Sequence, residues 1–456
     1  MNEELNPTHL RFKLAQNQSI SVHLEEFLIP INDQSLAGYV ASTKSALQIE
    51  DVYELPPHLP FHFNPDFDRN TGYKSQSLLS VPMIDHQDRL IGVVQLWNKK
   101  IHGKIRSFTE SDQKLLASLS SQAGVAIENA RLYEDIRKLF EGLIKASVLA
   151  IEARDPTTRG HSERVAVLTV ALTQAVDMIN HGPYKDVHFC REDIQAIEYA
   201  ALLHDMGKIG VPEAILIKAK KLYPWELDII RERIECWKYS VEMDFFKEKF
   251  LLMEAAVPFR RKELGQLESK FKTKLKEIDH VLEVIQQCNE PTVLSERVSQ
   301  DLKSLSQIQI YRSDSTPISL LDGDQLERLS IPKGSLSPSE RRWIESHVTH
   351  TYQLMQQIPW THNLRKLPEI AYAHHEKLDG SGYPRGICSN DIPLPSKIMA
   401  ICDIFDALVA SDRPYKKAIA LKDALRILEL EAKDQKLDEH LVKLFIEQNI
   451  FERTTP

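Results

Sequence analysis

Histidine and aspartate occur at four separated places in the second half of the chain, within otherwise apolar segments. They are His161 in RGHSERV, His204 and Asp205 in LLHDMGKIG, His347 in IESHV, His374 and His375 in AHHEKLDG, and Asp403 in AICDIFDAL. Imidazole and carboxylate together suit iron, manganese, zinc or nickel, and an aspartate beside a histidine can serve two ions. Two ions about 3.5 to 4 Å apart lower the pKa of a water and neutralise charge on a phosphoryl group. The pattern therefore predicts a two-metal centre suited to phosphodiester hydrolysis.

Helical periodicity places these side chains on the apolar faces of their segments. His161 is in phase with Leu168, and His204 continues a stripe that includes Ile197. One such histidine alone is more often a core residue than a ligand, but five histidines and two aspartates all need buried partners. Lys208, one turn after His204, suits contact with a phosphate, and a solvated lysine at a helix end is an equal alternative.

The segments that must position these residues change character along the chain. Short alternating apolar segments between about 10 and 100, separated by Gly, Asn, Asp and Pro, predict strands joined by turns. Residues 108–155 are helical in pattern, with Thr109 and Asp112 as a cap. A helix of that length favours a connecting rod or a parallel dimer seam, and two successive helices are the alternative. From 160 to 450 strand signals disappear, so we expect helices throughout.

An insertion interrupts the helical half. The segment KLYPWELDIIRERI (221–234) resembles SLSPSERRWIESHV (335–348), which indicates two similar helix starts on either side of an inserted segment, 235–330. Apolar residues with heptad spacing within it are Leu264, Leu267, Phe271, Leu275, Ile278, Leu282 and Ile285. This spacing predicts a helical hairpin or a coiled-coil arm.

The segments HDMGKIG, HHEKLDGSGYP and DALVASDRPYK resemble the HD-GYP family, a subgroup of the HD superfamily of metal-dependent phosphohydrolases. The resemblance covers about 140–235 and 330–450, within a domain of 140–450. It implies an all-α phosphodiesterase that hydrolyses cyclic di-GMP to linear pGpG, to GMP or to both. It also implies two divalent transition-metal ions, iron or manganese.

The same resemblance implies a role for each site residue. One ion would be held by His161, His204, Asp205 and Asp403, and its neighbour by Asp205, His347, His374 and His375. Asp205 would be the bridge and, with Lys208, a catalytic residue. Lys208, Arg413 and Lys416 would contact substrate phosphates.

Two positions bear on how far the resemblance extends. Family members with a third ion carry a glutamate four residues before the first histidine, where this chain has Thr157. Two ions are therefore expected rather than three. His350 lies one turn after His347 and is a rival ligand, although His347 matches the family's IxxH pattern.

The first 130 residues resemble a GAF domain, in FDRNTGYKSQSLLSVPMIDHQDRLIGVVQLWNK and the following FTESD. The resemblance implies an α+β fold, an antiparallel sheet with helices, whose first helix and strand are missing or shortened here. Asn98, Lys99, Phe108 and Asp112 are similar to the NK...FxxxD pattern of GAF domains that bind cyclic nucleotides. In that pattern the lysine and aspartate either mark a ligand site or tie the fold together, so the ligand stays unknown.

The composition of the chain argues against several classes of protein. The net charge of −8 in 456 residues gives no electrostatic reason to bind duplex nucleic acid or anionic lipid. The sequence shows neither a run of about 18 apolar residues nor a signal peptide, so we expect a cytoplasmic protein with no membrane contact. The five cysteines are scattered, which predicts no disulfides.

These observations predict a multidomain protein: an α+β GAF domain joined by a long helix, 108–155, to an all-α HD-type phosphohydrolase domain with a helical insertion. We expect a homodimer through the connecting helix, regulation by the GAF domain, and signalling partners such as a diguanylate cyclase. Two alternatives stay open. One is a scaffold or sensor that keeps the catalytic fold as a binding module, and the other is a phosphohydrolase that acts on a mononucleotide.

Overall fold

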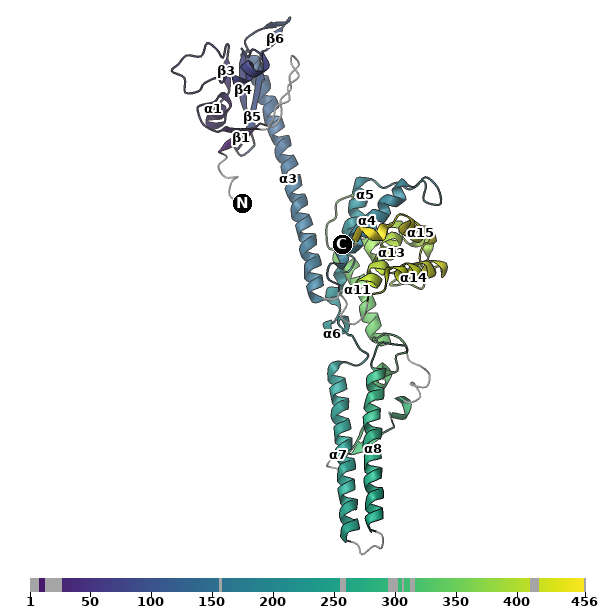
Figure 1. Ribbon diagram of the computed structural model, residues 1–456. Helices are drawn as coiled ribbons and strands as arrows, with labels where there is room; N and C mark the ends of the chain where they lie inside the picture. The colour runs from purple at the N-terminus through teal and green to yellow at the C-terminus, as the bar shows by residue number, and fades with distance from the viewer. Residues whose placement is uncertain are drawn as a thin grey trace. The chain divides into compact units, whose positions relative to one another are not determined.

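The structure is a computed structural model that describes residues 8–12, 27–155, 158–254, 260–293, 302–305, 307–311, 316–410 and 418–454. Three residues discussed above, Thr157, Arg413 and Lys416, lie outside these ranges. The chain divides into two compact units, residues 1–142 and 143–456. Figure 1 labels the elements of both.

The first unit is built on an antiparallel sheet of order β3-β4-β5, formed by Leu47–Ile49, Leu78–Ile84 and Leu90–Trp97. The two longer strands are the segments whose alternation predicted them. Successive side chains of a strand point to opposite faces, so Leu78 and Leu79 lie on different faces of the sheet. Both are fully buried, each in a different core cluster. The sheet is therefore covered on both faces.

Each face of the sheet has its own cover. Leu78 lies in a cluster with Leu36 of α1 (Leu36–Thr43), and Leu79 lies in a cluster with Leu116 of α3 (Glu110–Arg154). The remaining short elements are β1 (His9–Arg11), β2 (Leu28–Pro30), α2 (Asp66–Thr71), β6 (Lys100–Ile101) and β7 (Lys104–Ile105).

The long helix predicted at 108–155 is α3 (Glu110–Arg154). Its predicted cap is present: the Asp112 carboxylate accepts hydrogen bonds of 2.7 Å from both the backbone N–H and the hydroxyl of Thr109. Lys99 forms an ion pair with the same carboxylate. Asn98, at positive φ (55°), accepts from one loop N–H and donates to a loop carbonyl, each at 2.7 Å. These residues therefore tie the strand end to the helix start, the structural one of the two roles considered for them.

The second unit is mostly helical. The helices that pack around the predicted site are α4 (His161–Met178), α5 (Arg191–Leu203), η2 (Met206–Gly210), α11 (Pro338–Gln356), α12 (Leu367–Tyr372) and α13 (Leu394–Val409). The other described elements are α6 (Glu213–Leu216), α10 (Gly323–Leu329), η3 (Ser389–Asp391), α14 (Leu421–Lys433), α15 (Glu439–Glu447) and η4 (Ile450–Thr454). None of the helices in the described ranges combines the length and apolarity needed to cross a membrane.

The insertion forms the predicted helical hairpin, in which α7 (Pro224–Glu254) and α8 (Arg260–Cys288) pack side by side (Figure 1). The expectation of helices alone was wrong at one place, because β8 (Gln309–Tyr311) pairs antiparallel with β9 (Pro317–Ser319). Strands of three residues are too short for an alternating pattern to stand out in the sequence. Ile310 of this pair is buried in the core of the hairpin.

The two similar segments of sequence are two similarly capped helix starts. Helices α7 and α11 begin at the matched residues Pro224 and Pro338. In each, a glutamate, Glu226 or Glu340, accepts a hydrogen bond from the backbone N–H three residues before it, at 2.9 and 2.8 Å. Arg328 donates to Glu226 at 2.7 Å and lies 3.8 Å from Glu340, which links the base of the hairpin to α11.

Candidate metal centre

Seven predicted ligands, scattered over the sequence, come together in the helical unit. His161 is the first residue of α4, His204 and Asp205 lie between α5 and η2, and His347 lies within α11. The other three are His374 and His375, just after α12, and Asp403 in α13. All are buried except His375, whose side chain is 26% exposed.

The first group of ligand atoms is formed by His161, His204 and Asp205, which lie within 4.8 Å of one another. His204 Nε2 lies 3.4 Å and His161 Nε2 3.8 Å from Asp205 Oδ2. Asp403 adds a further oxygen, since its Oδ1 lies 3.1 Å from His161 Nε2. Two imidazoles and two carboxylates therefore surround one position.

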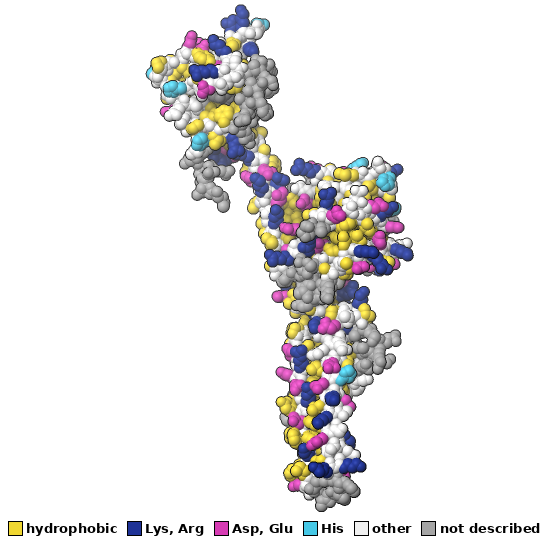
Figure 2. Space-filling view, viewed as in Figure 1, with side chains coloured by type: hydrophobic (Ala, Val, Ile, Leu, Met, Phe, Trp, Pro, Cys, Tyr) yellow, Lys and Arg dark blue, Asp and Glu magenta, His cyan; other side chains and the backbone are white. Residues whose placement is uncertain are grey.

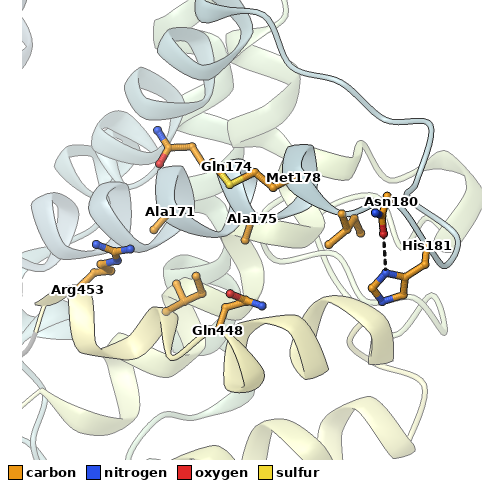
Figure 3. Close-up of a pocket in the computed structure, with 10 residues that line it drawn as sticks. Ala171, Gln174, Ala175, Met178, Asn180, His181, Gln448 and Arg453 are labelled. Atoms are coloured by element: carbon orange, nitrogen blue, oxygen red, sulfur yellow. Dashed lines mark hydrogen bonds between the residues drawn. The ribbon is translucent and has the colours of Figure 1, made fainter.

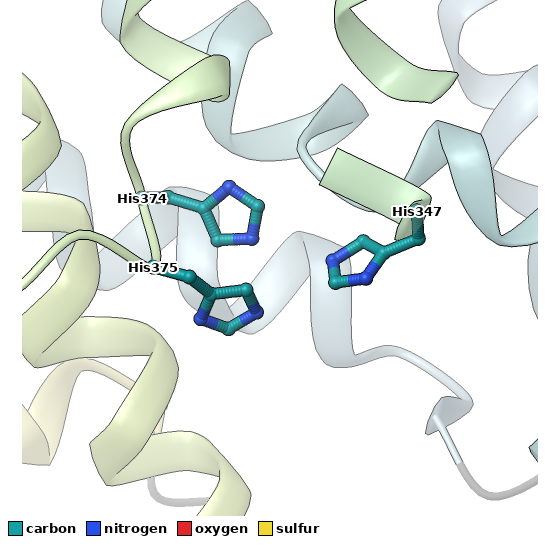
Figure 4. A group of neighbouring side chains, drawn as sticks. All are labelled: His347, His374 and His375. Atoms are coloured by element: carbon teal, nitrogen blue, oxygen red, sulfur yellow. The ribbon is translucent and has the colours of Figure 1, made fainter. Parts of the chain in front are cut away.

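The second group is formed by His347, His374 and His375, which face one another in Figure 4 and also place ligand atoms within 4.8 Å. Asp205 Oδ1 lies 3.3 Å from His347 Nε2, while its Oδ2 faces the first group. One carboxylate thus stands between the two groups.

Three imidazoles are oriented in the same way. His204, His347 and His374 each place Nδ1 at 2.6 to 2.7 Å from the backbone carbonyl three residues earlier. Each Nδ1–H donates there, which leaves Nε2 as the acceptor. The three Nε2 atoms are buried without a hydrogen-bond partner. An unpaired buried polar atom costs about 1 to 3 kcal/mol. Three of them in one cluster, two of which lie 3.3 and 3.4 Å from Asp205 oxygens, fit a site built for cations.

His161 is oriented by a carboxylate instead of a carbonyl. Its Nδ1 lies 2.8 Å from Asp406 Oδ2, and Arg164 donates to both oxygens of Asp406 at 2.7 and 3.0 Å. Such carboxylate–histidine pairs fix the tautomer and ring orientation of metal ligands. Sequence reasoning missed Asp406, although its place three residues after Asp403 on one helix was a usable signal.

Lys208 is held at the site, which excludes the alternative of a solvated lysine. Its Nζ lies 2.9 Å from Asp205 Oδ2 and 3.2 Å from Asp155 Oδ2, and its side chain is 15% exposed. Asp155 is a second residue that the sequence did not reveal.

The electrostatics of the site favour ionised carboxylates and neutral imidazoles. Burial alone would raise the pKa of Asp205, but Lys208 and the neighbouring histidines outweigh it and hold that pKa well below its usual range. Burial lowers the pKa of His375 to about 3 and that of His374 well below its ordinary value. These protonation states are the ones that bind cations. His161 and His204 differ. Asp403 and Asp406 overcome the burial of His161 and raise its pKa to about 9, and Asp205 and Asp403 likewise raise the pKa of His204.

The structure also distinguishes His347 from its rival. His347 faces Asp205, whereas the ring of His350 packs against Gly210, where an added Cβ would lie 2.5 Å from His350 Nδ1. Gly207 explains how α11 comes so close: a Cβ there would lie 1.9 Å from the backbone oxygen of His347. The glycine after the HD pair therefore permits the approach that brings His347 to the site.

The GSGYP loop folds back onto the second group. Glu376 accepts hydrogen bonds from the backbone N–H groups of Arg385 and Ile387 at 2.8 and 3.1 Å. The backbone N–H of Tyr383 donates to the carbonyl of His375 at 3.2 Å, and the two rings lie 4.8 Å apart. Glu376, which the sequence reasoning did not single out, thus holds the loop beside His375.

A separate pocket lies between α4 and η4 (Figure 3). It has a volume of about 320 Å³, is lined among others by Met178, His181 and Arg453, and contains none of the candidate ligands. No function follows from it.

Comparison with known families supports this architecture. The GAF domain family matches residues 11–127, and two HD domain families match residues 158–242 and 324–441. The interval between the HD matches falls in the insertion. The chain thus contains a GAF domain and an HD domain, as predicted.

Three curated relatives are cyclic dinucleotide phosphodiesterases by name. A 3'3'-cGAMP-specific phosphodiesterase 3 of Vibrio cholerae is 42% identical over 21% of this chain and 20% of its own length. A cyclic di-GMP phosphodiesterase of Thermotoga maritima is 39% identical over 23% of this chain and 27% of its own length. A 3'3'-cGAMP-specific phosphodiesterase 2 of Vibrio cholerae is 24% identical over 75% of this chain and 41% of its own length. These matches cover at most about two fifths of each relative.

Together the domain matches, the relatives and the motif residues confirm the family resemblance found in the sequence. The chain carries a GAF domain followed by an HD domain, and its motif segments resemble those of the HD-GYP group.

Proposed function

We propose that this protein is a metal-dependent phosphodiesterase that hydrolyses a cyclic dinucleotide. The observation that carries the proposal is the pair of buried ligand groups with the Asp205 carboxylate between them. The names of the relatives supply the substrate class. Cyclic di-GMP is the first candidate substrate, 3'3'-cGAMP is the second, and linear pGpG or GMP is the product.

The proposed ligands follow the two groups. One ion is held by His161, His204, Asp205 and Asp403, and the other by Asp205, His347, His374 and His375. Iron or manganese suits these nitrogen and oxygen donors. When bound, two such ions neutralise charge on a phosphodiester and lower the pKa of a water.

The chain's own residues orient the substrate in this proposal. Lys208 places a positive charge beside Asp205, where a phosphate of the substrate would lie. Arg413 and Lys416 are proposed as further phosphate contacts on the sequence resemblance alone. The loop that carries Tyr383 borders the second ligand group and would contact the substrate or a partner such as a diguanylate cyclase.

Regulation by the GAF domain is proposed to pass through α3. Four apolar residues of this helix, at spacings of four, three and four, are more than half exposed: Leu132 (52%), Ile136 (61%), Leu139 (66%) and Leu143 (59%). This is the seam of a coiled coil. We propose that α3 pairs in parallel with α3 of a second copy. Sedimentation tests this, since Ile136→Glu should shift the wild-type dimer toward the monomer.

The activity is tested by turnover of each cyclic dinucleotide with added iron(II) or manganese(II), comparing wild type with Asp205→Ala. We expect turnover in the wild type and a loss of at least a hundredfold in the variant. Equal turnover in both would contradict the proposed site. Metal analysis of the same anaerobic samples separates enzyme from scaffold, because a scaffold would hold less than one transition metal per chain.

A further inference from the structure

The outer face of α7 carries an apolar stripe, interrupted by Glu232, that nothing in the described chain covers. Figure 2 shows hydrophobic side chains along one side of the hairpin. The large exposed members of this stripe are Trp225 (54%), Ile229 (42%), Tyr239 (65%), Met243 (56%), Phe246 (53%), Phe250 (60%) and Met253 (57%). A large exposed apolar patch on a folded protein marks a site of interaction with another molecule.

The spacing of the stripe is that of a coiled-coil seam. Its members recur at alternating intervals of four and three residues from Trp225 to Met253, and the two remaining positions are Glu232 and Cys236. Cys236 is itself an exposed free thiol. A heptad pattern sustained over this length predicts pairing with another helix along the whole of α7.

This seam is distinct from the one inside the hairpin. The inner face of α7 buries Ile230 and Ile234 in the core shared with α8, and Phe245 stacks on Phe271 at 4.4 Å. Helix α8 has no large exposed apolar residue among those described. Helix α7 therefore has two apolar faces and α8 has one, which leaves the outer stripe of α7 to a helix from outside the hairpin.

We propose that the occupant is α7 of a second copy of this chain, paired in parallel and in register. In that arrangement the residue directly before each of the seam positions 229, 236, 243 and 250 lies at the edge of the seam. It faces the residue five positions later in the second copy. The facing pairs are Asp228 with Arg233, Glu235 with Ser240, Glu242 with Lys247, and Lys249 with Glu254. Three of these flanking pairs join opposite charges and none joins like charges, while within the seam Glu232 faces its own counterpart. Arg233 and Lys249 also bond within the chain, to Gln325 and Glu268. Charge complementarity thus selects a parallel pair of identical helices as the partner.

Cys236 provides the test, because a parallel pair in register brings this thiol against its own counterpart. A disulfide needs Cα atoms about 4.4 to 6.8 Å apart, and an antiparallel pair centred on the stripe places the two thiols more than a turn apart. The full chain, carrying Ile136→Glu so that α3 does not contribute, is oxidised with copper phenanthroline and separated without reductant. We expect a cross-linked dimer that falls at least tenfold in Cys236→Ser and persists in Cys190→Ser.

A matched control places a cysteine on the other helix of the hairpin. Glu277 on α8 has a side chain that is 57% exposed, so Glu277→Cys in the Cys236→Ser background reports random collisions. Cross-linking equal to that through Cys236 would overturn the proposal, as would a failure of Cys236 to cross-link at all. The second outcome would leave the stripe to a different protein or to an antiparallel pair.

A charge exchange tests the register independently of cysteine chemistry. Lys247→Glu places like charges against Glu242 of the second copy, and Glu242→Lys does the same against Lys247. In the Ile136→Glu background, where α3 does not contribute, we expect each single change to weaken dimerisation several-fold in sedimentation and the double exchange to restore it. A double variant as weak as the singles would refute parallel pairing in register. Far-UV circular dichroism verifies that the hairpin is folded in each variant.

Discussion

Asp406 offers a sharp test of the metal centre, because it touches a proposed ligand without being one. Its carboxylate is buried and holds His161 Nδ1 at 2.8 Å, while Arg164 donates to it twice. Asp406→Asn keeps the shape of the side chain but removes the charge and offers an N–H where His161 needs an acceptor. His161 should then lose its fixed orientation toward the first ion.

The size of the effect follows from these contacts. Loss of a carboxylate that orients a metal-ligating histidine costs about 10- to 100-fold in metal affinity. That is about 1.4 to 2.8 kcal/mol of binding free energy, at about 1.4 kcal/mol per tenfold. The second ion should be affected much less, because His347, His374 and His375 make no hydrogen bond to Asp406 among the described contacts.

The assay is calorimetric titration of metal-free protein with manganese(II), analysed for two sites. Asp438→Asn is a suitable control. Asp438, the N-cap residue of α15, also accepts a side-chain hydrogen bond, from Tyr184 at 2.6 Å, and it is not a proposed ligand. We expect one weakened site in Asp406→Asn and two unchanged sites in the control. Two unchanged affinities in a folded Asp406→Asn variant, or an equal loss at both sites, would refute the reasoning.

Three further predictions follow from single contacts. Gly207→Ala should destabilise the chain by about 1 to 3 kcal/mol in chemical denaturation and weaken the second ion, because its Cβ would meet the backbone of His347 at 1.9 Å. Asp112→Asn should cost about 1 kcal/mol at pH 7. The hydrogen bond from Lys99, followed by those from Thr109, lowers the Asp112 pKa to about 2. The ionised carboxylate therefore stabilises the fold above about pH 4, and the difference in stability between wild type and Asp112→Asn should vanish as pH falls toward 2. Glu376→Gln should reduce kcat/KM with unchanged metal content, since it loosens the loop; unchanged kcat/KM would show that the loop plays no part in turnover.

The sequence predicted the parts of this architecture that local patterns control. Alternation in SLLSVPMI and LIGVVQLWN predicted two strands, and the pairing of Thr109 with Asp112 predicted where the long helix begins. Heptad spacing in the insertion predicted a helical hairpin. The β8–β9 hairpin was missed because three residues carry too little pattern.

The candidate site was predictable for a different reason. Histidines on apolar helix faces are costly unless they have partners, and this cost made His161, His204 and His347 visible before any geometry was known. Their supporting residues were not visible in the same way. Asp406 and Asp155 both act across tertiary contacts. Asp406 had one signal, its place three residues after Asp403 on the same helix, whereas Asp155 follows the end of α3 with no local pattern that separates its role from solvent exposure. The outer seam of α7 was overlooked because α7 carries apolar residues on two faces, so neither heptad pattern stands out in its sequence.

The central claim is that Asp205 serves two ions at once. Metal per chain, measured in anaerobically prepared wild type and in Asp205→Asn, tests it most directly. The account predicts two transition-metal ions in the wild type and the loss of both in the variant, because each oxygen of this carboxylate faces a different ligand group. A wild type with one ion or none, or a variant that keeps its full complement, would contradict it.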